Sequence, residues 1–131
     1  MSALPVEPML DPVRQVEGFV HACLVDATSG MILSSLEEQD HMRLPVAAAG
    51  ATDIVNVLTM MTSELAVNGE AEDVIVTLHS HYLLIRLFRS APGQRLLLLV
   101  TLERPQANLA MAHREIRDFS TALCREHDWV A

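Results

Sequence analysis

Hydrophobic residues between positions 73 and 102 follow the pattern of three consecutive antiparallel strands separated by short turns. The three strands are expected at 74–78, 82–89 and 95–102. The last two are apolar on both faces, and in the third every residue from Leu96 to Val100 is hydrophobic. A strand of this kind has to be covered on both faces, so the pattern predicts a sheet that lies between two layers of helices.

The chain before position 37 predicts a short helix followed by a β-hairpin. Asp11 and Pro12 suit the start of a helix and Gly18 suits its end. Three apolar residues would share one face of this helix: Leu10, Val13 and Val16. The hairpin strands are expected at 19–25 and 31–36. The turn between them holds Asp, Thr and Ser, whose side chains cap backbone amides, and a glycine at position 30 that accepts a positive φ angle.

The longest helix is expected at 44–67. Pro45 fits its first turn, and Asn68-Gly69 provides a stop signal at its end. Apolar residues at helical spacing predict an inner stripe on the sheet: Ile54, Leu58, Met61 and Leu65. Further residues widen the apolar surface beyond that stripe: Val55, Thr59 and Met60. The surplus predicts that this helix contacts something besides its own sheet.

A last helix is expected to start at Pro105 and to place five apolar residues on one face: Leu109, Ala112, Ile116, Phe119 and Leu123. Residues 1–8 are expected to be a frayed N-terminus, and residues 127–131 a loose tail. No internal repeat or second core is visible, so residues 1–131 are interpreted as one domain.

Composition narrows the range of functions. The net charge of −8 opposes binding to nucleic acid or to anionic lipid. No apolar run in the sequence suggests membrane insertion, and no secretory signal is visible. The two cysteines lie far apart, which predicts reduced thiols in a cytoplasmic protein. All nine basic residues are arginine, a bias that suggests a GC-rich bacterial genome and excludes chemistry that needs a lysine.

The sequence contains no catalytic, nucleotide-binding or zinc motif, so no enzyme activity and no cofactor are expected. His79 and His81 have the spacing of two ligands on one strand face, but nothing nearby completes a metal shell, and a polar hairpin turn explains them better. His21 and Cys23 share a strand face, where a buried thiol beside a histidine is the favoured interpretation. Asp26 is explained by capping of the turn.

The first hairpin runs Gly18-Phe19-Val20-His21-Ala22-Cys23-Leu24-Val25-Asp26 and continues, after the turn, as Gly30-Met31-Ile32-Leu33-Ser34. An apolar last strand at 97–102 and an Asn108-Leu109 pair follow later in the chain. This arrangement resembles the roadblock family of dynein light chains and bacterial GTPase regulators, over about residues 10–123. The chain departs from the family in its proline-interrupted first helix and in the His79-Ser80-His81 turn.

The resemblance implies an α+β fold in which a five-stranded antiparallel sheet has the strand order 2-1-5-4-3. The long middle helix would cover one face and the terminal helices the other, as in a profilin-like sandwich. Family members are commonly homodimers joined through the third strand and the middle helix, and bacterial members are associated with small Ras-like GTPases. The resemblance therefore implies a non-catalytic, homodimeric module that binds, and by extension regulates, a small GTPase.

Two surfaces are expected to carry this function. The exposed edge of the third strand would template further strands, and pairing with its own copy covers it. Its residues are the expected dimer interface: Val74, Ile75 and Val76. The GTPase is expected on a side of the middle helix where a methionine is ringed by small polar groups. The residues of this partner surface are Asn56, Thr59, Met60 and Ser63.

The alternative is a small-ligand sensor or minor enzyme on a similar sandwich, which would use His21, Cys23 and His113. That function requires a closed polar pocket around those three residues, whereas a scaffold requires a broad apolar surface. The sequence leaves open which GTPase is bound and whether the chain activates it, blocks it or only localises it.

Overall fold

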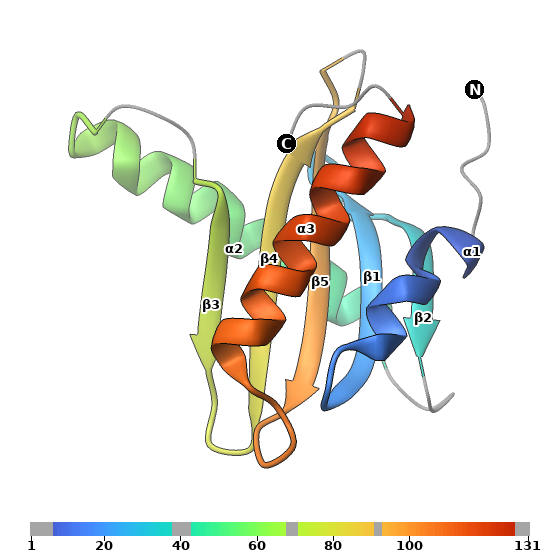
Figure 1. The fold of residues 1–131 in the computed structure, drawn as a ribbon. Coiled ribbons are helices and arrows are strands. Elements are labelled where there is room, and N and C mark those ends of the chain that lie inside the picture. Colours follow the sequence, from blue (N-terminus) through green and yellow to red (C-terminus); the bar gives the residue numbers. More distant parts are fainter. Residues whose placement is uncertain (1–6, 38–42, 68–70, 91–92, 128–131) are drawn as a thin grey trace.

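The computed structural model describes residues 7–37, 43–67, 71–90 and 93–127. The elements are α1 (Glu7–Leu10), a 3₁₀ helix η1 (Asp11–Gln15), β1 (Phe19–Asp26), β2 (Ile32–Glu37), α2 (Leu44–Glu64), β3 (Asp73–Thr77), β4 (His81–Arg89), β5 (Arg95–Glu103) and α3 (Leu109–His127). The strands form one antiparallel sheet in the order β2-β1-β5-β4-β3, as expected. Helix α2 lies on one face of the sheet, and α1, η1 and α3 lie on the other (Figure 1). The α+β sandwich inferred from the sequence is therefore confirmed.

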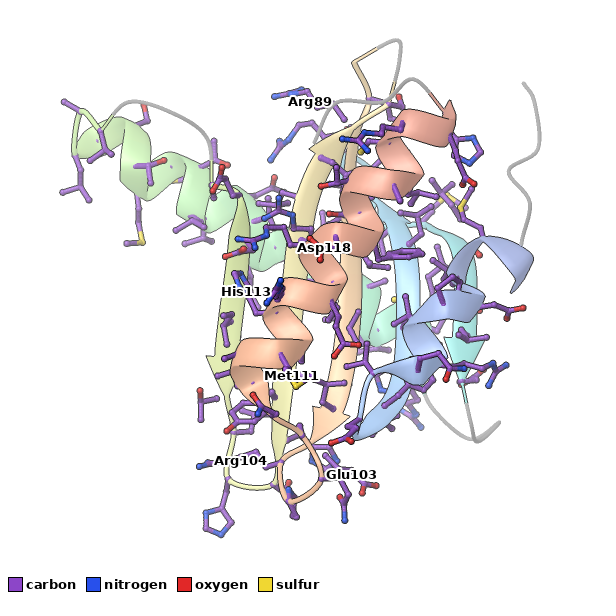
Figure 2. The ribbon with its side chains drawn as sticks, viewed as in Figure 1. Arg89, Glu103, Arg104, Met111, His113 and Asp118 are labelled. Carbon is purple, nitrogen blue, oxygen red and sulfur yellow. The ribbon has the colours of Figure 1, made fainter. Side chains whose placement is uncertain are left out.

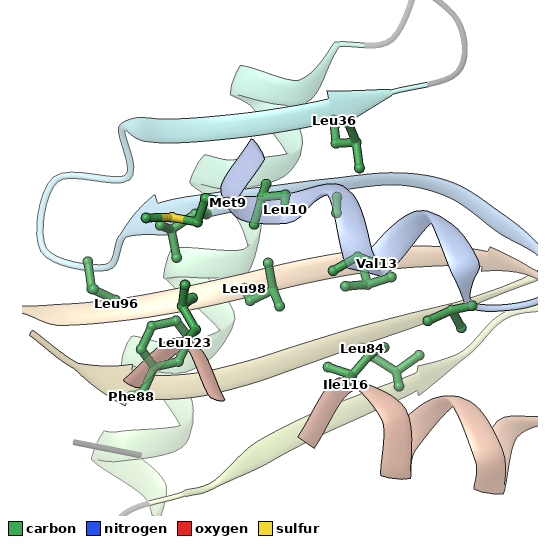
Figure 3. Packing of buried hydrophobic residues seen from close by; sticks show 14 of the residues in the cluster. Met9, Leu10, Val13, Leu36, Leu84, Phe88, Leu96, Leu98, Ile116 and Leu123 are labelled. Atoms are coloured by element: carbon green, nitrogen blue, oxygen red, sulfur yellow. The ribbon is translucent and has the colours of Figure 1, made fainter. Parts of the chain in front are cut away.

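Two hydrophobic cores occupy the two faces of the sheet. Alternate residues of β5 divide between them, with Leu96, Leu98 and Val100 packed against α1, η1 and α3, and Leu97 and Leu99 packed against α2. All five are buried. Figure 3 shows the larger core, in which side chains of α1 and η1 meet side chains of the sheet and α3. Strand β5, which is apolar on both faces, is thus covered by helices on both faces, as the sequence predicts.

The first helical segment begins earlier than predicted. Helix α1 starts at Glu7, and Asp11 opens η1, in which Pro12 occupies the first turn. The predicted inner residues Leu10, Val13 and Val16 are buried all the same. The segment ends at Gly18, whose φ angle is +86°, and a Cβ there would lie 2.8 Å from the carbonyl oxygen of Glu103. Only glycine fits this crossing, because the backbone conformation and the close approach both exclude a side chain.

The turn of the first hairpin has the predicted chemistry. The Asp26 carboxylate accepts a hydrogen bond from the amide of Thr28 at 2.9 Å, and the Ser29 hydroxyl accepts one from the amide of Met31 at 3.2 Å. Gly30 has a φ angle of +80°. Burial acts to raise the pKa of Asp26, but hydrogen bonds from Thr28, Gln94 and Ser29 together lower it. The carboxylate is thus a charged cap of the turn.

The predicted inner stripe of the middle helix is wrong. The residues of α2 that are buried are Leu44, Ala48, Ala51, Thr52 and Val55. In contrast, Ile54, Met61 and Leu65 of the predicted stripe are exposed, and Leu58 is half-buried. Figure 1 shows the reason: only the first half of α2 crosses the sheet, and its second half extends past β3. The small alanines permit the close crossing, and the larger apolar residues lie where the sheet has ended.

The ends of the two long helices also differ from the prediction. Helix α2 ends at Glu64, and Ala66 takes the left-handed conformation with a φ angle of 53°. Asn68-Gly69, the predicted stop, lies outside the described residues. Helix α3 starts at Leu109, after a turn that contains Pro105, because the Asn108 side chain accepts a hydrogen bond from the amide of Met111 at 3.1 Å. The five predicted inner residues of α3 do pack on the core.

By length and composition, α2 is a helix that could cross a membrane, contrary to the expectation from the sequence. Its 21 residues contain an 18-residue window with a mean hydropathy of 1.4, of which 28% is buried. A helix of a soluble protein reaches the same length and mean hydropathy when it is apolar on more than one side. Here the apolar residues divide between the side on the sheet and an exposed side, so this helix is weak evidence for membrane insertion.

Candidate functional site

Strand β3 forms one edge of the sheet and, among the described strands, pairs only with β4. It carries the three residues that the sequence predicts at a dimer interface. Ile75 is 39% exposed, and Val74 and Val76 are half-buried. No described strand pairs with the other side of β3, and an open apolar edge is a template for a further strand.

A groove of about 360 Å³ lies between this edge and the second half of α2. It is lined by Asp53, Ile54, Val57, Leu58, Met61 and Val74. Met61 is 52% exposed, and Val57 and Leu65 are also largely exposed on this helix. The groove lies on the α2 side of the edge strand, and Ile75 lies on the opposite face of the same strand. The groove and the edge strand are together named here the edge surface, which consists of these lining residues with Leu65, Ile75 and Val76.

The predicted partner surface lies on a different side of α2. Its members, Asn56, Thr59, Met60 and Ser63, are spaced so that successive helical turns bring them together. All are exposed, with Met60 at 66%. The Thr59 hydroxyl donates a hydrogen bond to the carbonyl of Val55 at 2.9 Å, so its polar group is satisfied within the helix. The surface therefore presents a methionine among small polar side chains.

Beside the partner surface is a cleft of about 790 Å³ that the sequence analysis missed. It lies between the second half of α2 and the ends of β4 and β5, and Thr59 and Ser63 belong to its lining. Three arginines also line it: Arg86, Arg89 and Arg95. Figure 2 shows Arg89 at the end of β4 on the side of α2. The sequence signal for this cleft was a hairpin in which Arg89 ends one strand and Arg95 begins the next. The register of β4 and β5 places these two arginines opposite each other.

A polar network connects the first residue of β3 to α3 on the other face of the sheet. The Asp73 carboxylate accepts a hydrogen bond from Arg86 Nη1 at 3.1 Å and lies 2.7 Å from His113 Nε2. Arg86 Nε donates to the Ser120 hydroxyl at 3.3 Å. The Arg86 side chain is only 10% exposed, so its charge depends on these partners. His113 points from α3 toward β3 (Figure 2). The network fixes the edge strand to the layer of α3.

The residues of the alternative function are not brought together. His21 and Cys23 lie on the strand face that contacts α2, whereas His113 lies on α3 across the sheet. Burial, with a smaller contribution from the charge of Glu37, raises the pKa of the Cys23 thiol to about 12. A thiol of this kind is not a nucleophile at neutral pH. Cys124 is a free thiol in the opposite core, and burial raises its pKa as well.

His21 instead belongs to a row of polar residues across three strands. It pairs with Glu37 of β2 on one side and with Thr101 of β5 on the other. Within the described residues, His21 Nδ1, Glu37 Oε2 and Thr101 Oγ1 are buried without a hydrogen-bond partner. Burial and the charge of His81 lower the pKa of His21, against a smaller opposing effect of a backbone hydrogen bond. His21 is therefore a neutral histidine at physiological pH.

The turn between β3 and β4 consists of Leu78, His79 and Ser80, and His81, which the sequence placed in the turn, is the first residue of β4. His79 is exposed, and the Ser80 hydroxyl lies 2.7 Å from His81 Nδ1. In the part of the chain that the structure describes, no group of three or more His, Cys, Asp or Glu side chains is arranged to hold a metal ion.

The strand order, the placement of the helices and the apolar edge together define a roadblock-type fold. By sequence, no family model and no curated protein matches the chain. Among solved structures, Myxococcus xanthus MglB is similar at 15% identity over 92% of this chain and 89% of that chain, with a TM-score of 0.73.

Two further solved structures have the same architecture. The gliding protein MglB of Thermus thermophilus is 18% identical over 92% of this chain and 87% of that chain, with a TM-score of 0.76. A Roadblock/LC7 domain from Streptomyces avermitilis is 18% identical over 94% of this chain and 97% of that chain, with a TM-score of 0.76. Likeness at this level of identity shows the fold, and the fold inferred from the sequence is confirmed.

Proposed function

We propose that this protein is a non-catalytic, homodimeric scaffold of the bacterial cytoplasm that binds a small Ras-like GTPase. The observation that supports it best is the edge surface: an unpaired strand beside the exposed apolar side of α2, on a roadblock-type fold. The roadblock resemblance supplies the class of partner. The alternative of a sensor or enzyme is less well supported, because burial makes the Cys23 thiol unreactive and the residues of the alternative site lie on opposite faces of the sheet.

A second copy of the chain suits the edge surface. Two β3 strands related by a two-fold axis would pair antiparallel and satisfy each other's open backbone groups. The same axis would bring the exposed side of each α2 toward its copy, so that Met61 and Leu65 pack instead of facing water. One similar solved structure is described as MglB with tetrameric arrangement, with 16% identity and a TM-score of 0.77, so that protein does assemble.

The GTPase suits the partner surface, because this side of α2 stays exposed when the edge surface pairs. In the dimer, the two partner surfaces would lie on the same layer of the joined sheet. Met60 offers apolar area without a charge to desolvate, and Asn56, Thr59 and Ser63 offer small polar groups around it.

The test is calorimetric titration of the cognate GTPase, loaded with GDP or GTP, into the wild type and into the double variant Met60→Glu, Asn56→Arg. An unpaired charge in a buried contact is costly, so we expect affinity to fall at least ~30-fold, about 2 kcal/mol. The matched control is Met111→Glu, because Met111 is 59% exposed on α3 and faces away from α2. Light scattering on each variant checks that the oligomeric state is unchanged. Equal affinity of the double variant and the wild type would contradict the proposal.

A further inference from the structure

We propose that Gly50 of α2 receives the Met61 side chain of a second copy of the chain, and that this contact fixes the register of the two helices and selects an identical copy as the partner. The inference rests on the proposed function, because it takes the homodimer as given. The contact itself follows from an open glycine, the order of the exposed side chains along α2 and the course of that helix.

Gly50 is not required by the packing of its own chain. It lies inside α2 and is exposed, and a Cβ built on it would have no atom within 4 Å. Its backbone is helical, so no positive φ angle explains the glycine either. Glycine inside a helix lowers stability relative to alanine. An open glycine of this kind suits a place where the side chain of another molecule approaches the helix closely.

Gly50 belongs to a row of six exposed residues that runs from the first turn of α2 to its C-cap. Their spacing of four, four, three, four and four residues places them on one side of the helix. This row, named here the symmetric stripe, consists of Val46, Gly50, Ile54, Val57, Met61 and Leu65. Its five side chains are apolar and 40% to 66% exposed. Three of them line the groove of the edge surface, so the stripe is continuous with it.

The spacing of the symmetric stripe is the same when it is counted from either end. Two identical helices that pair antiparallel about a two-fold axis need this property, because each position then contacts the equivalent position counted from the other end. With the axis between positions 54 and 57, the contacts are Val46 with Leu65, Gly50 with Met61, and Ile54 with Val57. The methionine of the stripe therefore lies on the one member that has no side chain.

The course of α2 allows a second copy to reach the stripe. The first half of α2 crosses the sheet, and the second half extends past β3 (Figure 1). In a dimer joined along β3, the second half of each helix therefore lies over the sheet of the other copy, beside the first half of its α2. Gly50 belongs to the first half and Met61 to the second, so the joined sheet brings the two residues toward each other.

A methionine packed on a glycine also discriminates between partners. A larger residue at position 50 would overpack the contact, and a smaller one at position 61 would leave a cavity. A chain with other residues at these two positions therefore pairs less well with this one, although it has the same fold. Selection by size of this kind is a way to favour an identical copy.

The experiment measures dimer dissociation constants by sedimentation equilibrium for the wild type, Gly50→Leu, Met61→Ala and an equimolar mixture of these two variants. Gly50→Leu should weaken the dimer at least tenfold, and Met61→Ala at least threefold. In the mixed dimer each contact again joins one large and one small side chain, so it should be tighter than both variant homodimers. Native mass spectrometry identifies the mixed dimer by its mass. The control is Ala49→Leu, at an exposed position outside the stripe, which should leave the dimer unchanged.

Cross-linking tests the same contact without a large side chain at position 50. On mild oxidation, Gly50→Cys combined with Met61→Cys should form a disulfide between copies, because only a short approach of the two helices permits this bond. Ala49→Cys combined with Met61→Cys should not. Absence of the cross-link, or equal cross-linking in the control, would overturn the inference.

The outcomes separate this inference from the proposed function. If the wild type is a dimer but Gly50→Leu pairs as tightly, or the mixture forms no excess of mixed dimer, the contact is wrong and the homodimer stands. If the wild type is a monomer at micromolar concentration, both the homodimer and the contact are wrong. Circular dichroism checks that Gly50→Leu keeps the fold, as the open space around position 50 predicts.

Discussion

At the scale of single residues, backbone conformation explains why certain positions hold the amino acids they do. Gly18 is required by both its positive φ angle and the 2.8 Å approach to Glu103. Ala66 also has a positive φ angle, although it is not a glycine. The amide of the next residue, Val67, donates a hydrogen bond to the carbonyl of Thr62 at 3.2 Å. This bond completes the usual glycine-type helix end with a residue that is strained there.

The strain at Ala66 gives a simple prediction. Ala66→Gly should raise the free energy of unfolding by about 1 kcal/mol, because glycine adopts the left-handed conformation without a Cβ clash. Urea denaturation at fixed protein concentration measures the change. The control is Ala122→Gly, an exposed position inside α3, where the same substitution should lower stability by a similar amount. A loss of stability in Ala66→Gly would show that the helix end is held in some other way.

The buried state of His21 predicts a pH dependence. Its pKa in the folded protein is lowered below the ordinary value of 6.5, so the unfolded chain takes up the proton first as the pH falls. The stability due to neutral His21 is fully present above the unfolded pKa and is lost as the pH falls through the folded pKa. In unfolding curves from pH 8 to pH 5, His21→Gln should lose less stability on acidification than the wild type, and His79→Gln, at an exposed turn, should behave like the wild type. An equal acid dependence in His21→Gln and the wild type would contradict this assignment.

At the scale of elements, the sheet could be predicted from the sequence more fully than the helices. Strand faces follow from simple alternation, so the burial of Leu96 to Val100 and its division between two cores were predictable. The orientation of α2 could not be predicted in this way, because its alanines form one apolar side and its large apolar residues form another. Periodicity alone does not say which of the two sides contacts the sheet. Small residues mark the close crossing in this case, and Ile54 and Met61 mark the exposed side.

The network at Asp73 is the connection between elements that the sequence could not reveal, since its members come from β3, β4 and α3. Asp73→Asn should lower the free energy of unfolding by about 2 kcal/mol, because it leaves the nearly buried Arg86 without its carboxylate. Asp118→Asn, at an exposed position of α3, is the matched control and should change stability by less than about 0.5 kcal/mol. Denaturation of Asp73→Asn, of Arg86→Met and of the two combined measures the coupling between the two side chains. Additive effects in the double variant would show that the pair is not energetically linked.

At the scale of the whole molecule, the account depends on what covers the edge surface. The sequence indicated surplus apolar area on the middle helix and an exposed β3 edge, and both are present in the structure. It did not indicate the cleft beside the partner surface or the true position of the apolar stripe, because both depend on where α2 leaves the sheet. No sequence motif marks either surface, so its residues can be recognised only from where the fold places them.

The measurement that tests the central claim most directly is the molar mass of the protein in solution at micromolar concentration, by light scattering after size exclusion. The account predicts twice the chain mass of 14.5 kDa for the wild type and for Met111→Glu. Met61→Glu places an unpaired charge in the edge surface, and Ile75→Pro deletes a backbone donor from the edge strand. Each should weaken the dimer at least tenfold and shift the mass toward 14.5 kDa while the fold is kept, as judged by circular dichroism. A stable wild-type monomer, or a dimer unaffected by Met61→Glu, would contradict the account.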